Sequence, residues 1–171
     1  MTLRSLSPRE STSPYLAWLR DPVVTRFLEV RFRAYDAQSL ERFIAACNDS
    51  NDTLLLGIVT NDDGRHIGNL KLAQVSHRHK RAEVGLLIGE RSAWGHGFAT
   101  DSLRTICRYA FGPLGLHKIT AGCYEHNVAS IRAFLNAGFE QVAVLADHWL
   151  LDGAWTGQVL LQRLAPPSST D

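Results

Sequence analysis

The sequence predicts an α+β fold, in which a single mixed, mostly antiparallel sheet is flanked by helices. Strand-like apolar runs and segments of helical apolar spacing both occur, but they do not alternate as in a repeating βαβ winding. Three strand-like runs between residues 53 and 89 are separated only by turn sequences, and Asp152-Gly153 joins the last two runs. Such short connections join antiparallel strands.

The first third of the sequence predicts one short strand followed by helices. Residues 2–6 (TLRSL) alternate weakly and are a candidate strand. Apolar residues recur at helical spacing over 13–29, and Asp21-Pro22 divides this segment into two short helices. Asp36 is a suitable N-cap for a helix over the sequence AQSLERFIAACN at 37–48.

The middle of the sequence predicts a three-stranded meander. Residues 53–59 (TLLLGIV) form a buried strand, and the turn NDDG precedes a second strand over 65–75. The basic run HRHKR at 77–81 leads into the third strand at 82–89. We interpret this run as a solvated turn, with recruitment of an acidic protein or an anionic sugar nucleotide as the alternative.

The remaining elements are two helices, a strand and a closing hairpin. A helix is expected over 98–111 and a strand over 117–124. Asn127 begins a second helix that Gly138 ends. The hairpin comprises 139–151 and 154–164. We expect one domain over 1–164 and a frayed Pro/Ser-rich tail over 165–171.

Composition narrows the function classes. The chain has 171 residues, 45% of them hydrophobic, and a formal net charge of +1, which gives no reason to expect nucleic acid as a partner. The three cysteines are widely spaced, without a CxxC pair, so we expect core residues and no metal site. No signal peptide or membrane-spanning run is recognised, which indicates a cytoplasmic setting.

Two glycines mark a turn between the predicted strand at 82–89 and the helix at 98–111. In the sequence RSAWGHGFAT, Gly95 and Gly97 permit backbone angles that other residues resist. Free N–H groups at the following helix start would bind an anion such as phosphate, although a tight turn without a ligand is the alternative. Neither G-x-G-x-x-G nor G-x-x-x-x-G-K-[ST] is present, so the cofactor is of another kind.

The strings VGLLIG and WGHGFAT, followed by YEHNVASIRAFLNAGF, resemble the GNAT superfamily of acetyl-CoA-dependent N-acetyltransferases. The likeness extends over residues 3–164 and is greatest to the branch that acetylates ribosomal-protein N-termini and amino sugars. Gly95 and Gly97 fill the glycine positions of the family signature, (Q/R)-x-x-G-x-(G/A), and Gly138-Phe139 ends the Asn-led helix as in the family.

The resemblance implies the GNAT fold, acetyl-CoA as co-substrate, no metal, and direct transfer of acetyl to a primary amine. The strand at 86–89 would bind the pantetheine amides, and its N–H groups would polarise the thioester carbonyl. The residues expected to bind the cofactor are Leu87, Ile88, Gly89, Trp94, Gly95, His96, Gly97, Phe98, Ala99, Thr100, Asn127, Ser130 and Phe134.

Several positions depart from the family pattern. Ser92 stands where the signature has Gln or Arg, and His96 occupies a place that is often Lys or Arg. Phe134 occupies the position where many members carry a tyrosine that protonates the leaving thiolate. The substitution of that tyrosine leaves open a second function class, a non-catalytic acyl-CoA-binding module on the same fold.

Acid–base groups limit the choice of acceptor. Glu83 and His148 are the candidate bases, each with a purely structural alternative, and Ser130 and Tyr124 are candidate partners of the thiolate. An amine with a pKa near 8 needs only weak assistance, so we expect a protein N-terminal α-amine or an amino sugar rather than lysine. No nucleic acid or membrane partner is expected, and a homodimer is left open.

Overall fold

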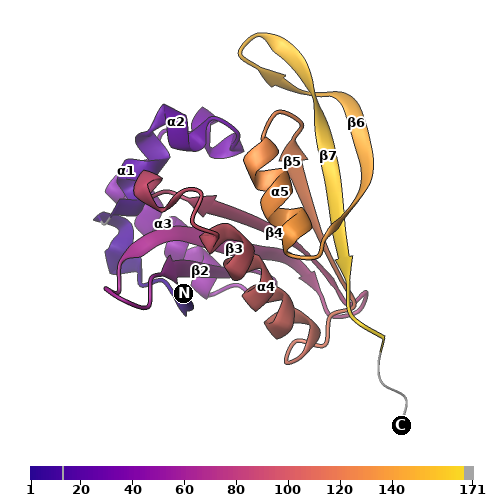
Figure 1. Ribbon diagram of the computed structural model, residues 1–171. Helices are drawn as coiled ribbons and strands as arrows, with labels where there is room; N and C mark the ends of the chain where they lie inside the picture. The colour runs from indigo at the N-terminus through magenta and orange to yellow at the C-terminus, as the bar shows by residue number, and fades with distance from the viewer. Residues whose placement is uncertain (13, 168–171) are drawn as a thin grey trace.

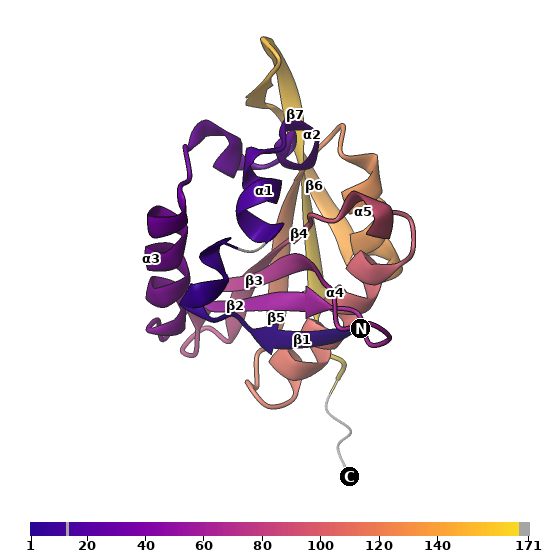
Figure 2. The same cartoon turned by 90° about the vertical axis from the view of Figure 1, so that its left-hand side faces the viewer.

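The computed structural model describes residues 1–12 and 14–167 and contains a seven-stranded sheet with helices on both faces (Figure 1, Figure 2). The strand order is β1-β2-β3-β4-β5-β7-β6, and every neighbouring pair is antiparallel except β4 and β5. The strands are β1 (Thr2–Ser5), β2 (Leu54–Val59), β3 (His66–Ser76), β4 (Arg81–Ile88), β5 (Lys118–Tyr124), β6 (Glu140–Leu151) and β7 (Ala154–Leu164). The predicted mixed, mostly antiparallel sheet is confirmed.

Five α-helices and three short 3-10 segments accompany the sheet within the described residues. They are η1 (Pro8–Thr12), α1 (Pro14–Arg20), α2 (Pro22–Thr25), η2 (Glu29–Phe32), α3 (Ala37–Asn48), η3 (Arg91–Ala93), α4 (Phe98–Phe111) and α5 (Val128–Asn136). None of these helices is long and apolar enough to cross a membrane.

Side-chain caps fix the predicted helix starts. The Asp21 carboxylate accepts a hydrogen bond from the Val23 N–H at 2.8 Å, and Pro22 begins α2. The Asp36 carboxylate accepts from the Ser39 N–H at 2.7 Å, while Ser39 Oγ accepts from the Asp36 N–H. Because each of these bonds joins residues at most three positions apart, the sequence alone predicts where α2 and α3 begin.

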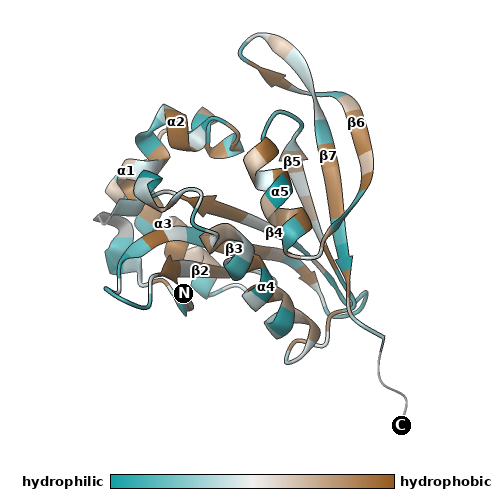
Figure 3. Ribbon diagram, in the orientation of Figure 1, coloured by the Kyte–Doolittle hydropathy of each residue, from teal (hydrophilic) through white to brown (hydrophobic). Residues whose placement is uncertain are grey.

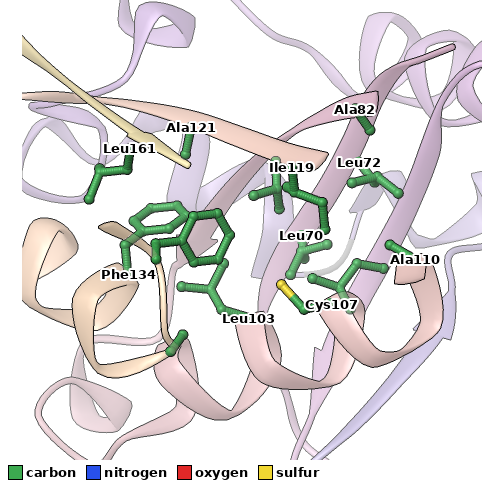
Figure 4. Packing of buried hydrophobic residues seen from close by; sticks show 14 of the residues in the cluster. Leu70, Leu72, Ala82, Leu103, Cys107, Ala110, Ile119, Ala121, Phe134 and Leu161 are labelled. Carbon is green, nitrogen blue, oxygen red and sulfur yellow. The ribbon is translucent and has the colours of Figure 1, made fainter. Parts of the chain in front are cut away.

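Hydrophobic cores lie on both faces of the sheet. The larger core packs α4 and α5 on one face, with Leu70, Leu103 and Phe134 among its buried residues (Figure 4). The smaller core packs α1 and α3 on the other face, where Trp18 and Ile44 are buried. The cysteines expected in the core are buried, and burial raises the pKa of each thiol: Cys47, Cys107 and Cys123.

The parallel strands β4 and β5 are paired at only one end. Arg81, Ala82 and Glu83 pair with Lys118, Ile119 and Thr120, respectively, and the pairing stops there. On its other side β4 remains paired with β3 as far as Ile88. The two strands therefore diverge toward their carboxyl ends, as Figure 1 shows. We call the space between their diverging ends the cleft between β4 and β5.

The hairpin of β6 and β7 extends beyond the rest of the sheet. Its ladder is interrupted on β6 between Leu145 and Trp149, whose partners Gln158 and Thr156 are only two residues apart. Asp147 lies in this bulge with φ 49°. Figure 3 shows hydrophobic segments along β6. The exposed hydrophobic residues of this strand are Val142, Val144, Leu145 and Leu150.

The predicted tail at 165–171 is only partly within the described residues. Ala165 donates its N–H to the His117 carbonyl at 2.8 Å, so the chain stays attached to the sheet one residue beyond β7. Residues 168–171, and residue 13 in the predicted first helix, lie outside the described part of the chain.

Candidate functional site

The turn with two glycines connects the carboxyl end of β4 to α4. Gly95 and Gly97 have φ angles of 78° and 81°, in the left-handed region that glycine enters without strain. Gly97 is the N-cap of α4. A Cβ atom added to either glycine would meet no atom within 4 Å, so internal packing does not explain the absence of a side chain there.

The backbone of this turn has unused hydrogen-bond donors. The first bond into α4 runs from the Asp101 N–H to the Gly97 carbonyl at 3.0 Å. Among the described residues no backbone carbonyl accepts from the N–H groups at positions 95–100. Several N–H groups at a helix start, above an open surface, fit the charged oxygens of a phosphate.

Every second residue near the end of β4 directs its backbone N–H and C=O groups toward the cleft. The Gly89 N–H donates to the Ile67 carbonyl at 2.9 Å, and Ile88 is paired opposite Gly68. In an antiparallel ladder this arrangement directs the N–H and C=O groups of Leu86 and Ile88 away from β3, toward the cleft. The amides of Leu87 and Gly89 are engaged with β3, whereas those of Leu86 and Ile88 are free to face the cleft. Cofactor contact through Leu87, Ile88 and Gly89 stays a prediction.

The predicted cofactor residues on the two helices are adjacent. Thr100 Oγ1 donates to the Ala133 carbonyl at 3.4 Å, which joins the start of α4 to α5. The Asn127 side chain caps α5 by accepting from the Ser130 N–H at 3.2 Å. Ser130 Oγ lies 3.4 Å from the buried Cys123 Sγ, and Trp94 Nε1 donates to the Ile88 carbonyl at 2.8 Å.

Phe134 belongs to the larger core. Its ring is 2% exposed and packs edge-on against Phe139, with 5.0 Å between ring centroids. Figure 4 shows it among Leu103, Ala121 and Leu161. The side chain is thus packed inside the protein, and its contact with a cofactor stays a prediction.

The two candidate bases are not brought together. Glu83 is exposed at the point where β4 and β5 stop pairing, and it accepts a hydrogen bond from Gln74 Nε2 at 3.2 Å. It lies about 13 Å along the strand from the level of Leu87, at ~3.3 Å per residue. His148 is exposed on the bulged part of β6, where its ring contacts Trp149 edge-on at 4.7 Å.

A polar and aromatic cluster lies where β5 ends, and sequence reasoning identified only part of it. The Tyr124 hydroxyl donates to the Glu29 carboxylate and accepts from the Arg31 guanidinium at 3.1 Å. The Tyr124 ring stacks on Trp149 at 5.3 Å. Burial, with a further contribution from Glu29, raises the pKa of Tyr124 to about 12, so the phenol remains protonated at neutral pH. Contacts between residues 95 apart in sequence leave no local signal.

A hollow of about 620 Å³ adjoins this cluster, between α1, α2, η2 and the tip of the hairpin. Its charged lining residues are Arg20, Arg26, Arg31, Arg33 and Asp152. We call it the arginine hollow. No group of three or more His, Cys, Asp or Glu side chains that could hold a metal ion occurs among the described residues.

The chain is similar to known acetyltransferases in sequence and in fold. The sequence pattern of the acetyltransferase (GNAT) domain matches residues 1–140. The uncharacterised N-acetyltransferase YoaA of Bacillus subtilis (strain 168) is 28% identical over 155 residues, which cover 90% of this chain and 86% of YoaA. The [ribosomal protein uS5]-alanine N-acetyltransferase of Escherichia coli (strain K12) is 31% identical over 84 residues, 48% of this chain and 42% of that enzyme.

A solved structure shares the whole fold. The crystal structure of spermidine N-acetyltransferase from Vibrio cholerae in complex with CoA and spermine superposes with a TM-score of 0.85. The match covers 96% of this chain and 95% of that protein at 19% identity. The chain is therefore a member of the GNAT acetyltransferase family, an acetyl-CoA-dependent N-acetyltransferase.

Proposed function

We propose that the domain of residues 1–164 transfers acetyl from acetyl-CoA to an amine of low pKa, either a protein N-terminal α-amine or an amino sugar. The observation that carries this proposal is the position of the two predicted bases and of the Glu29 carboxylate. Glu83 lies far along β4 from Leu87, His148 is exposed on the hairpin, and the Glu29 carboxylate is bound to Tyr124.

The binding roles follow from backbone geometry. Bound acetyl-CoA would supply the activated acetyl thioester. The N–H groups from Gly95 to Thr100 would hold its pyrophosphate, at about 1.5–3 kcal/mol for each charge-assisted hydrogen bond. The Leu86 and Ile88 amides, directed into the cleft, would bind the pantetheine arm, and one N–H would stabilise negative charge on the thioester oxygen.

The acceptor must present a neutral amine. At pH 7 an amine of pKa 8 is about one tenth neutral, whereas a lysine amine near pKa 10.4 is neutral about four times in ten thousand. This difference, roughly 3 kcal/mol, is large for a site without a well-placed base. A low-pKa acceptor needs only Glu83 or His148, acting through water, to take the released proton.

Residues near the cleft could also assist the departing thiol. Ser130 Oγ is half-buried on the first turn of α5 and already lies beside Cys123. The Tyr124 hydroxyl keeps its proton at neutral pH because its pKa is about 12. We propose that the thiolate accepts a hydrogen bond from the Ser130 hydroxyl, or from the Tyr124 hydroxyl after it turns away from the Glu29 carboxylate, in the absence of a tyrosine at position 134.

An acceptor screen that measures free thiol release from acetyl-CoA tests the proposal. We expect N-terminal peptide amines or amino sugars to react faster at neutral pH than lysine side chains. If Glu83 or His148 is the base, Glu83→Gln or His148→Gln, respectively, should lower kcat about 10²–10⁴-fold while acetyl-CoA binding survives. Faster reaction of lysine would refute the acceptor class, and near-full rates in both variants would refute the base assignment.

A polyamine is the competing acceptor. It is favoured by the structural neighbour, which is a spermidine N-acetyltransferase crystallised with spermine. Spermidine therefore belongs in the same screen, and preference for it over peptide and sugar amines would replace our proposal.

A further inference from the structure

The lining of the arginine hollow carries more positive than negative charge, in a protein whose formal net charge is +1. Four of its ten lining residues are arginines, and Asp152 is the only carboxylate among them. Guanidinium groups bind carboxylates and phosphates through paired N–H donors. The charge distribution therefore favours an anionic group in the hollow.

Two of the four arginines have structural hydrogen bonds. Arg20 donates from Nε and a terminal nitrogen to the Tyr35 carbonyl, at 3.2 and 3.0 Å. Arg31 donates to the Leu150 carbonyl at 3.2 Å and to the Tyr124 hydroxyl, and its guanidinium lies over the Phe32 ring at 4.5 Å. These bonds hold both guanidinium groups at the hollow, but they use some of the N–H donors that could otherwise bind a ligand.

The other two arginines have donors to spare. Arg26 meets Asp152 in a single exposed contact of 3.2 Å, which is worth little in water. Arg33 is exposed, and its backbone N–H donates to the Val30 carbonyl at 3.0 Å, but its guanidinium group has no hydrogen bond or ion pair with any other described residue. No ion pair among the described residues joins Arg33 to Asp21 or Glu29, whose carboxylates accept hydrogen bonds from the Val23 N–H and the Tyr124 hydroxyl, respectively.

Residues that line the hollow contact, or directly adjoin a residue that contacts, the strand ends on both sides of the cleft. Arg31 contacts Tyr124, the last residue of β5. Leu19 also lines the hollow, and the ring of the preceding residue, Trp18, covers Gly89 at the end of β4. A molecule whose amine enters the cleft would thus have its remaining atoms beside the arginines.

We propose that the acceptor carries a carboxylate or phosphate, which binds in the arginine hollow through Arg33 and Arg26. This inference rests on the proposed function, because it assigns the hollow to the acceptor of that reaction. It also separates this chain from enzymes for polyamines, since a second ammonium group would face four guanidinium groups. Two sources share the required chemistry: a protein N-terminus followed by acidic residues, and a phosphorylated amino sugar.

Calorimetric binding to matched pairs tests the proposal and distinguishes the sources. One pair is the peptides Ala-Glu-Glu and Ala-Gln-Gln with amidated C-termini, and the other is glucosamine 6-phosphate and glucosamine. We expect the anionic member of one pair to bind about tenfold more tightly or better, as for one charge-assisted hydrogen bond. Arg33→Gln should remove most of this preference. Arg78→Gln, which removes the same charge from the exposed turn between β3 and β4, should leave it unchanged.

Two results would overturn the inference: equal binding of the anionic and neutral members of both pairs, or an unchanged preference in Arg33→Gln. Tighter binding of spermidine than of any anionic compound would also overturn it. Thiol release tests the reaction separately. If anionic compounds bind through Arg33 but no amine releases thiol, the proposed function fails and the anion site remains.

Discussion

The substitution Gly97→Ala should separate the cost of backbone strain from the loss of cofactor binding. Gly97 has φ 81°, and a Cβ atom there would meet nothing within 4 Å. The substitution therefore introduces no internal clash, and its cost is the left-handed backbone of a non-glycine residue, about 1–2 kcal/mol. For a chain of this size that is a decrease in Tm of about 2–8 °C.

The effect on acetyl-CoA binding should be larger. Acetyl-CoA at 100 times its Kd stabilises the wild type by about 2.7 kcal/mol, or about 5–11 °C in Tm. The added methyl group occupies the open surface at the N–H donors, and loss of one or two charge-assisted hydrogen bonds weakens binding about a hundredfold. The same ligand concentration then stabilises the variant by only about 0.4 kcal/mol.

Gly64→Ala is the matched control for a thermal-shift assay. Gly64 has φ 68° in the turn between β2 and β3, and a Cβ atom there also meets nothing within 4 Å. Without ligand, both variants should be destabilised by similar amounts. Only Gly97→Ala should also lose the increase in Tm that acetyl-CoA produces. A full shift in Gly97→Ala would refute the assignment of the glycine turn, and a lost shift in Gly64→Ala would show that strain alone explains the effect.

Three further predictions concern stability. Gly89→Ala should cost about 1–3 kcal/mol in urea unfolding, because its Cβ would lie 2.0 Å from the Trp18 ring, whereas Gly85→Ala, with nothing within 4 Å, should cost little or nothing. Equal losses in the two variants would contradict this reading of the packing. Phe134→Ala should cost about 3–5 kcal/mol, since the ring is 2% exposed; a loss below 1 kcal/mol would show that the ring does not support the core. Burial lowers the pKa of His66, so the unfolded chain binds the proton first and stability should fall as the pH drops below about 6.5. Urea unfolding at pH 7.5 and 5.5 should show a smaller decrease for His66→Gln than for the wild type, and equal decreases would exclude His66 as the cause.

Local chemistry made most of the fold predictable. Asp36 and Asn127 form side-chain caps within three residues of themselves, and Asp152-Gly153 forms its turn from adjacent residues. The glycine turn could be recognised for the same reason, because Gly95 and Gly97 determine their own backbone conformation. Sequence alone therefore located the helix starts, the hairpin and the glycine turn.

The features that escaped prediction depend on contacts between distant residues. Whether Leu86 or Leu87 directs its amide into the cleft depends on the register between β4 and β3. A register shift of one residue would turn the Leu87 amide, instead of the Leu86 amide, toward the cleft. The arginine hollow combines Arg26 and Arg33 with Asp152, which is more than a hundred residues away. No periodicity or spacing in the sequence predicts that Asp152 lies beside these arginines.

The strand order has a consequence for the synthesis of this chain on the ribosome. β7 lies between β5 and β6, although it is the last of the seven strands. While the chain emerges from its N-terminal end, the edge of β5 therefore has no partner until residues 154–164 are available. The nascent sheet thus exposes the unpaired edge of β5 until late in translation. During this period the edge can most easily pair with a strand of another chain.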